Sequence, residues 1–211
     1  MTFSRDERDA LCGLLSEKGP HAPTLCEGWA TRDLAAHLVL REHRPDAAIG
    51  ILGGPFAGYT VHVQHNIAQQ YDYPRLIEMI RQGPPRLSVF GIPGMDERAN
   101  AVEYYVHHED VRRAVPGWEP RRLDPASEDM LWHRLGMARM LLRKAPCGIV
   151  LRAESPKAPA ITAKRGTPAV TVTGTPGELT LWSLGRTSAA RVRLDGDSDA
   201  VTRLGRARWR L

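Results

Sequence analysis

The segment Thr31–Leu40, with the sequence TRDLAAHLVL, is the starting point for the fold, because it predicts a buried helix that has Thr31 as its N-cap and runs to about Arg44. From Leu34 onward it is apolar on nearly every side, and a helix that is hydrophobic all round belongs in a core. His37 is the exception, because a polar side chain in an apolar setting needs a hydrogen-bond partner or a metal ion. On this segment alone, a core histidine bonded to a neighbouring carbonyl is the commoner arrangement.

A second helix, predicted from Asp96 to about Val115, carries an acid, a histidine and a further acid. At about 100° per residue, Glu103, His107 and Asp110 fall in one narrow sector of this helix. Small and branched apolar residues flank that sector, so we expect it to face the core. The alternative is an exposed i,i+4 Glu–His pair, which would contribute only about 0.2–0.5 kcal/mol.

Together the two helices predict a metal site. His37 from one helix, with Glu103 and His107 from the other, offers two imidazoles and one carboxylate, the usual ligands of a catalytic zinc ion with one open position. Asp110, one turn further along, is placed to orient a ligand or to act as a base. His108 points about 100° away from His107, so both cannot bind the same ion from one regular helix.

The remaining pattern changes at Ala145–Pro146, from helical to β-prone. Before this point, apolar spacing predicts further helices over residues 3–18, 61–70, 74–82 and 127–144. After it, the pattern predicts strands over residues 149–151, 160–163, 170–173 and 190–194, and helices over residues 176–185 and 198–208. We therefore expect an α+β protein with a helical domain over residues 1–145 and a small α+β domain over residues 146–211.

Charge is spread unevenly along the chain, whose formal net charge is +5 from 29 Lys and Arg against 24 Asp and Glu. Residues 1–145 carry 18 basic and 19 acidic side chains, and residues 146–211 carry 11 and 5. Four arginines and a tryptophan lie between Arg203 and Arg210, a composition that suits nucleic acid. Attraction of a small anion to the domain junction explains the imbalance as well, and no nucleic-acid-binding fold is recognisable.

Several classes of protein are excluded or disfavoured. Cys12, Cys26 and Cys147 are odd in number and lie far apart with no C-x-x-C spacing, which excludes a disulfide framework and an all-cysteine zinc site. The N-terminus lacks the apolar region of a signal peptide, and no apolar run approaches the ~18–20 residues of a membrane span. We therefore expect a cytoplasmic protein without a membrane partner. Motifs of NTPases, serine hydrolases and Rossmann enzymes are absent. We expect Cys26 to pack as a small apolar residue, with a reactive thiol as the alternative, and Trp29 to anchor the core.

Two N-terminal motifs resemble signatures of a known family. The segment Thr24–Leu38, with the sequence TLCEGWATRDLAAHL, is similar to the first signature of the mycothiol-dependent maleylpyruvate isomerase family, in which a cysteine, a Gly-Trp pair, an Asp-Leu pair and a histidine occur in this order. Glu103–Ala114, with the sequence EYYVHHEDVRRA, resembles the second signature. In the C-terminal part, residues 174–186 and 192–197 resemble a looser motif of the family's second domain.

The resemblance implies both a fold and a chemistry. The fold would be a DinB-like metal-binding four-helix bundle followed by a small α/β domain of the sterol-carrier-protein type. The family's metal ligands would be His37, Glu103 and His107, and the ion a divalent metal, with zinc the expected one. Mycothiol would be the small thiol, used for transfer or isomerisation on a small electrophilic, anionic substrate. Asp110 and Arg186 are the predicted catalytic residues, and a non-catalytic metal- or thiol-binding protein is the alternative.

Overall fold

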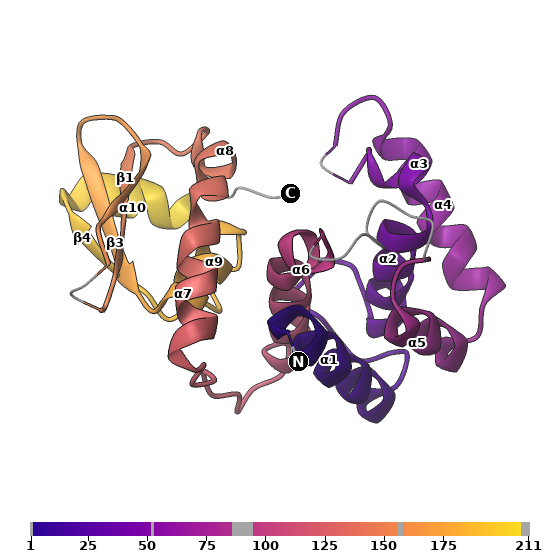
Figure 1. The fold of residues 1–211 in the computed structure, drawn as a ribbon. Helices are drawn as coiled ribbons and strands as arrows, with labels where there is room; N and C mark the ends of the chain where they lie inside the picture. The colour runs from indigo at the N-terminus through magenta and orange to yellow at the C-terminus, as the bar shows by residue number, and fades with distance from the viewer. Residues whose placement is uncertain (1, 52, 86–94, 156–157, 208–211) are drawn as a thin grey trace. The chain divides into compact units, whose positions relative to one another are not determined.

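The computed structural model describes residues 2–51, 53–85, 95–155 and 158–207, and its chain divides into two compact units (Figure 1). The first unit comprises Met1–Glu119 and the second Pro120–Leu211. The first is helical in its described residues and the second combines helices with a sheet. The α+β class predicted from the sequence is therefore confirmed.

Helices build the described part of the first unit. They are α1 (Phe3–Lys18), α2 (Thr31–His43), α3 (Pro45–Ala48), α4 (Ala57–Gln70), α5 (Tyr73–Gln82) and α6 (Met95–Arg112). Helix α1 packs on α5 and α6, and α2 packs on α4 and α5. Leucines of α1, α2 and α5 form much of the core, including Leu11, Leu38 and Leu76. Five of these helices have ten or more residues, so the bundle of four that the resemblance implies is not confirmed.

The N-terminal boundary of α2 lies one residue earlier than predicted from the sequence. Threonine is a residue type that favours the N-cap position, but the N-cap of α2 is Ala30, and Thr31 is the first helical residue. The Thr31 hydroxyl instead donates to the carbonyl oxygen of Gly19, at the end of α1. Asp33 Oδ2 accepts from the amide of Ala30 at 2.9 Å, which satisfies one of the amide groups that a helix N-terminus leaves unpaired. The helix that carries His37 is thereby fixed to α1 at its first turn.

The second unit is a sheet covered by helices. Its elements are α7 (Pro125–Arg134), the 3₁₀ turn η2 (Leu135–Met137), α8 (Ala138–Leu142), β1 (Gly148–Ala153), β2 (Ile161–Lys164), β3 (Ala169–Gly174), α9 (Pro176–Ser183), β4 (Arg193–Gly196) and α10 (Ser198–Arg206). The strand order is β2-β1-β3-β4, with β1 and β3 parallel and the two outer pairs antiparallel. Alternate residues of β1 and β3 are buried, so one face of the sheet supplies the core.

The division between the units falls after Glu119, earlier than the boundary at residue 145 that the sequence suggests. Helices α7 and α8 cause this difference, because Trp132 and Leu142 join the sheet core with Ile149 and Val170. The predicted helix 127–144 is also interrupted by the turn η2. The difference in charge is larger with this division than with a boundary at residue 145. Residues 1–119 carry 12 basic and 16 acidic side chains, and residues 120–211 carry 17 basic and 8 acidic side chains.

Candidate metal centre

Helix α2 places His37 in the interior of the first unit. The helix is apolar around most of its circumference, and Leu34, Leu38 and Leu40 are fully or almost fully buried. His37 is itself buried, and its Nε2 lies 3.3 Å from Glu103 Oε1 on α6. The imidazole therefore has a carboxylate partner rather than the backbone carbonyl that is usual for a core histidine.

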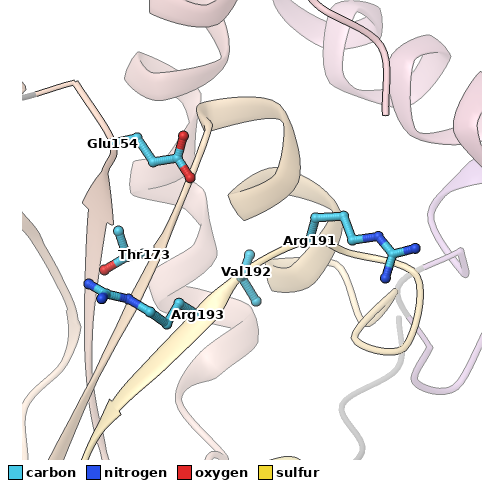
Figure 2. Close-up of a pocket in the computed structure, with 5 residues that line it drawn as sticks. All are labelled: Glu154, Thr173, Arg191, Val192 and Arg193. Atoms are coloured by element: carbon cyan, nitrogen blue, oxygen red, sulfur yellow. The ribbon is translucent and has the colours of Figure 1, made fainter. Parts of the chain in front are cut away.

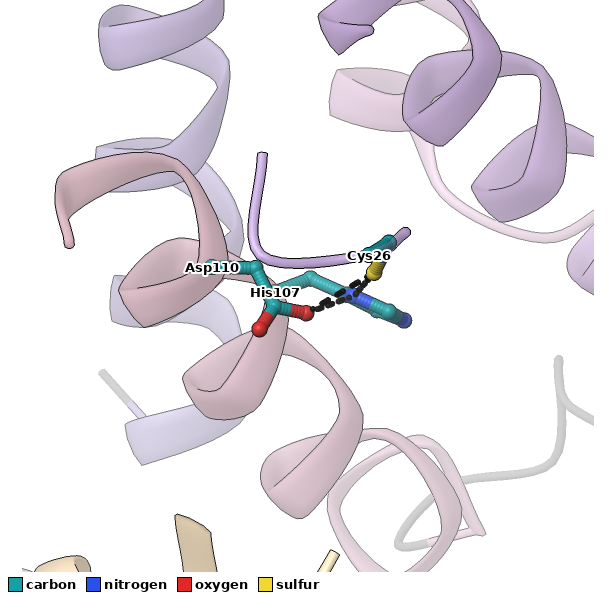
Figure 3. Close-up of side chains that lie close together, drawn as sticks. All are labelled: Cys26, His107 and Asp110. Atoms are coloured by element: carbon teal, nitrogen blue, oxygen red, sulfur yellow. Dashed lines mark hydrogen bonds and ion pairs between the residues drawn. The ribbon is translucent and has the colours of Figure 1, made fainter. Parts of the chain in front are cut away.

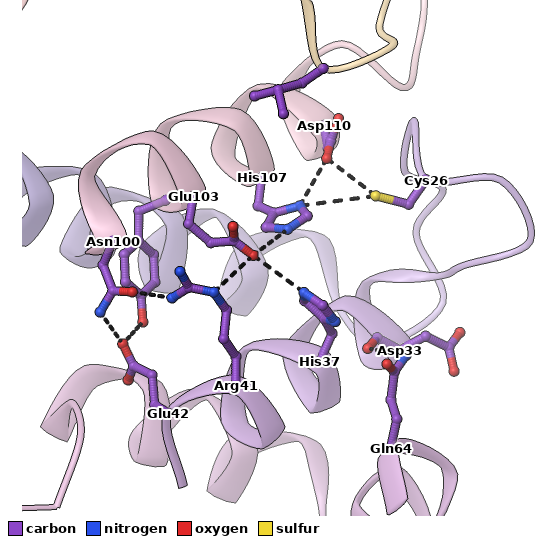
Figure 4. A network of polar contacts seen from close by, with 12 residues as sticks. Cys26, Asp33, His37, Arg41, Glu42, Gln64, Asn100, Glu103, His107 and Asp110 are labelled. Atoms are coloured by element: carbon purple, nitrogen blue, oxygen red, sulfur yellow. Dashed lines mark hydrogen bonds and ion pairs between the residues drawn. The ribbon is translucent and has the colours of Figure 1, made fainter. Parts of the chain in front are cut away.

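Helix α6 brings the other two predicted ligands to the same point (Figure 4). His107 lies one turn after Glu103, and its Nε2 is 3.2 Å from the same carboxylate oxygen, Oε1. The rings of His37 and His107 are 5.4 Å apart between centroids and meet edge to face. One donor atom from each of the three residues lies within 4.8 Å of the other two. Helical phase inferred from the sequence predicted that Glu103 and His107 share one direction, and the structure adds His37 from α2 at the same point.

Asp110 fixes the orientation of His107 from the side opposite Glu103. The carboxylate is fully buried, and its Oδ2 accepts a hydrogen bond from His107 Nδ1 at 2.8 Å (Figure 3). With Nδ1 engaged in this way, Nε2 is the nitrogen that faces Glu103 and His37. A carboxylate behind a ligating histidine is a recurrent arrangement in metal sites, because it fixes the tautomer and the ring orientation.

The charges of the cluster balance one another. Burial favours a neutral Glu103, but the nearby Arg41 guanidinium, whose Nε is 3.4 Å from Oε1, and hydrogen bonds with the two histidines hold the pKa of Glu103 well below its usual value. Burial lowers the pKa of His37. Burial acts in the same direction on His107, but the hydrogen bonds with Asp110, Cys26 and Glu103 outweigh it and raise the pKa of His107 well above its usual value.

Cys26 belongs to this cluster, which the sequence did not predict. It lies in the loop between α1 and α2 and is only partly buried. Its Sγ donates to Asp110 Oδ2 at 3.2 Å and lies 3.9 Å from His107 Nδ1 (Figure 3). The expected role of Cys26 as a small packing residue is therefore incomplete. A motif in which a cysteine precedes a histidine-bearing helix was the available signal, but spacing along a loop does not indicate where a thiol points.

The donor set of His37, Glu103 and His107 suits a divalent metal ion. Two imidazole nitrogens and one carboxylate oxygen match the first shell of catalytic zinc, and related divalent metals accept the same ligands. The donors come from two helices that also pack in the core, so they are held before any ion binds. Binding would release a proton from a histidine that carries one, because only a neutral imidazole coordinates a metal.

The other histidine of the motif is used for packing between helices. His108 Nδ1 lies 2.8 Å from Glu7 Oε2 on α1, and both side chains are buried. His108 thus points away from the cluster, as the helical phase predicts. The neighbouring Glu109 pairs with Arg112 and Arg113 of the same helix. The sequence His107–Asp110 therefore serves both a candidate metal site and the attachment of α6 to α1.

Arg186 lies in the second unit, in the turn that follows α9, and is partly buried. Its Nη1 donates to the carbonyl oxygen of Leu184 at 2.7 Å. Its predicted role in catalysis stays a prediction. The basic tail is described only as far as residue 207, so Arg208, Trp209 and Arg210 lie outside the described residues.

A pocket in the second unit has a different set of lining side chains from the candidate metal centre (Figure 2). It is lined by Glu154, Thr173, Arg191, Val192 and Arg193. This lining contains one carboxylate, two guanidinium groups and no imidazole or thiol. Among the described residues, the two groups of side chains with the composition and spacing for a metal ion both lie in the first unit, and they share His107.

Comparison with known proteins supports the assignment of the first unit. Residues 4–49 match the family model of the mycothiol maleylpyruvate isomerase N-terminal domain, a range that includes Cys26, Trp29 and His37. This matched range lies within the first unit and ends before α4. The resemblance that the sequence indicates is thereby confirmed, whereas Glu103 and His107 lie beyond the matched range.

The fold of the whole chain agrees with that assignment. A crystal structure of the mycothiol-dependent maleylpyruvate isomerase is similar with a TM-score of 0.54 and 16% sequence identity, over 92% of this chain and 90% of that one. At this identity the likeness establishes a shared fold and no more. No curated protein matches the chain. In the described residues, no helix is both long and apolar enough to cross a membrane.

Proposed function

We propose that this protein binds a divalent metal ion, most simply zinc, through His37, Glu103 and His107, and uses a small thiol on an electrophilic substrate. The convergence of these three side chains on one point from two helices carries the proposal. Mycothiol is the thiol that we propose, because residues 4–49 match the family model of the mycothiol maleylpyruvate isomerase N-terminal domain. The reaction class would be transfer or isomerisation, in the cytoplasm.

The chain's own residues would have distinct roles in this chemistry. His37 and His107 would offer their Nε2 atoms and Glu103 its Oε1 to the ion, leaving one position open to a thiol. Asp110 would hold His107 through Nδ1 and keep the ring in place. Arg41 would hold the Glu103 carboxylate in its ionised form. A bound divalent ion lowers the pKa of a thiol that coordinates it and so makes a nucleophile available at neutral pH.

Turnover of the thiol tests the proposal and separates it from simple binding. We expect the zinc-loaded protein to accelerate addition of mycothiol to a small anionic electrophile such as a cis-unsaturated dicarboxylate. Glu103→Gln should lose this activity, because the amide no longer supplies an anionic ligand, while the chain stays folded. Loss of the mycothiol thiol, followed with a thiol reagent, measures addition, and conversion of the cis to the trans dicarboxylate measures isomerisation, which returns the thiol. Full zinc occupancy without any turnover would instead favour the non-catalytic metal- or thiol-binding protein.

Arg186 gives a separate prediction for the substrate. If its guanidinium attracts an anionic substrate, then Arg186→Gln should raise KM for that substrate and leave the zinc affinity unchanged, because the substitution removes a positive charge and with it a long-range attraction. The matched control is Arg206→Gln, since this exposed arginine of α10 in the same unit is not among the residues that line the pocket. Initial rates over a range of substrate concentrations and at two salt concentrations measure the effect. An unchanged KM would contradict the role of Arg186.

A further inference from the structure

We propose that the turn Cys26–Trp29 is a positioning element that holds both histidines of the metal centre from outside the ligand set. Cys26 acts on His107 through Asp110, and Trp29 acts on His37 by direct packing. The inference rests on the proposed function, since it assumes that these histidines hold a metal ion. It assigns a role to two residues that would otherwise be only a thiol and a packing residue.

The contact of Cys26 with α6 involves both its side chain and its neighbour's backbone. Cys26 Sγ donates to Asp110 Oδ2, the same oxygen that accepts from His107 Nδ1. The amide of Leu25 donates to the carbonyl oxygen of Asp110 at 3.0 Å. Asp110 is therefore fixed at its backbone and at its carboxylate by the same loop. A carboxylate held in this way restricts the plane of the His107 ring.

Trp29 restricts the second histidine. Its indole ring lies 5.0 Å from the His37 imidazole between centroids, at an angle of 47°. Trp29 is partly buried and packs against the core of the first unit. The His37 ring therefore packs against the tilted indole ring of Trp29, while Glu103 lies at its Nε2. Rotation of the His37 ring away from the cluster would lose this packing.

A tight turn couples the two contacts. The amide of Trp29 donates to the carbonyl oxygen of Cys26 at 3.0 Å, so that Cys26 and Trp29 are the first and last residues of a β-turn. Gly28, the third residue, has φ of 79°, in the left-handed region that side chains other than glycine seldom adopt. Thr24 Oγ1 donates to the carbonyl oxygen of Trp29 at 2.9 Å and accepts from the amide of Cys26 at 3.1 Å. The thiol and the indole are therefore placed as one unit.

Cobalt(II) and zinc(II) binding tests the inference, with affinities measured by competition against a chromophoric chelator. Because loss of an outer-shell partner costs about 10–100-fold in metal affinity, we expect Cys26→Ala to weaken zinc binding about tenfold. Cys26→Ser should retain most of the affinity, since its hydroxyl still donates to Asp110. Gly28→Ala should also weaken binding: nothing lies within 4 Å of the added Cβ, so its effect comes from the backbone conformation alone.

Cys147→Ala, which removes a buried thiol in the second unit, is the matched control and should bind zinc like the wild type. The cobalt(II) protein should lack a thiolate-to-cobalt charge-transfer band, because Cys26 is not a ligand, while its d–d bands should shift in Cys26→Ala as His107 reorients. Unchanged zinc affinity and d–d bands in both Cys26→Ala and Gly28→Ala would overturn the inference. So would a charge-transfer band that disappears in Cys26→Ala, since Cys26 would then be a ligand. If the wild type itself bound no metal, the proposed function would fail instead.

Discussion

Glu42→Ala is expected to destabilise the first unit by about 3–5 kcal/mol, because it removes the carboxylate that pairs with the buried Arg8 guanidinium. Glu42 lies near the end of α2 and is almost fully buried, as is Arg8 of α1. Arg8 Nη1 donates to Glu42 Oε2 at 2.8 Å. The other oxygen, Oε1, accepts from Tyr104 Oη at 2.8 Å and from Asn100 Nδ2 at 3.0 Å, both on α6. One carboxylate thus connects α2 with two further helices, and Figure 4 shows its contact with Asn100 of α6.

Chemical unfolding of the metal-free protein measures this effect, with fluorescence used to follow the first unit. The matched control is Glu17→Ala, because Glu17 pairs with Lys18 on the surface and exposed pairs contribute about 0–1 kcal/mol. Glu42→Gln should fall between the two, since the amide keeps the shape and part of the hydrogen bonding. If Glu42→Ala were no more destabilising than Glu17→Ala, the buried network would not stabilise the unit as the structure indicates.

His37→Ala is expected to have the largest effect on metal binding, a loss of zinc affinity beyond the roughly 10–100-fold that removal of an outer-shell partner costs. His37 is the one predicted ligand on α2, so without it Glu103 and His107 must bind the ion from a single helix. Two ligands from one face of a helix leave most of a tetrahedral first shell to water. Zinc affinity by competition with a chelator gives the measurement.

His65→Ala is the control for this prediction. His65 lies on the exposed side of α4, where its Nε2 pairs with Gln69 Nε2, and it is absent from both candidate metal groups. We expect its zinc affinity to equal that of the wild type. Equal affinities for His37→Ala and His65→Ala would place the bound metal elsewhere in the chain.

Local sequence patterns predicted the parts of this protein in which one element decides the geometry. The bounds of α1 were predicted correctly, and those of α2 to within a residue, because apolar spacing and a following Gly or Pro are local signals. The common direction of Glu103 and His107 followed from helical periodicity alone. The convergence of His37 with them needed the resemblance, since no local pattern states which helices are neighbours.

The parts that the sequence did not predict depend on contacts between distant segments. The contact of Cys26 with Asp110 joins a loop to a helix 84 residues later, and a loop has no periodicity from which to infer a direction. Glu42 was not singled out either, since its partners come from α1 and α6. The boundary at residue 145 followed a change of pattern, but Trp132 and Leu142 pack with the strands that come after them. The change of pattern along the chain therefore lies after the division between the two units, which falls at Glu119.

Anomalous X-ray diffraction at the zinc edge, from crystals of the zinc-loaded protein, tests the metal centre most directly. We predict one strong peak per chain, bounded by His37 Nε2, Glu103 Oε1 and His107 Nε2 at the distances of about 2.0–2.2 Å that zinc ligands adopt. A peak bounded by Cys26 and Asp110 instead, or no peak in the first unit, would contradict the proposed metal centre.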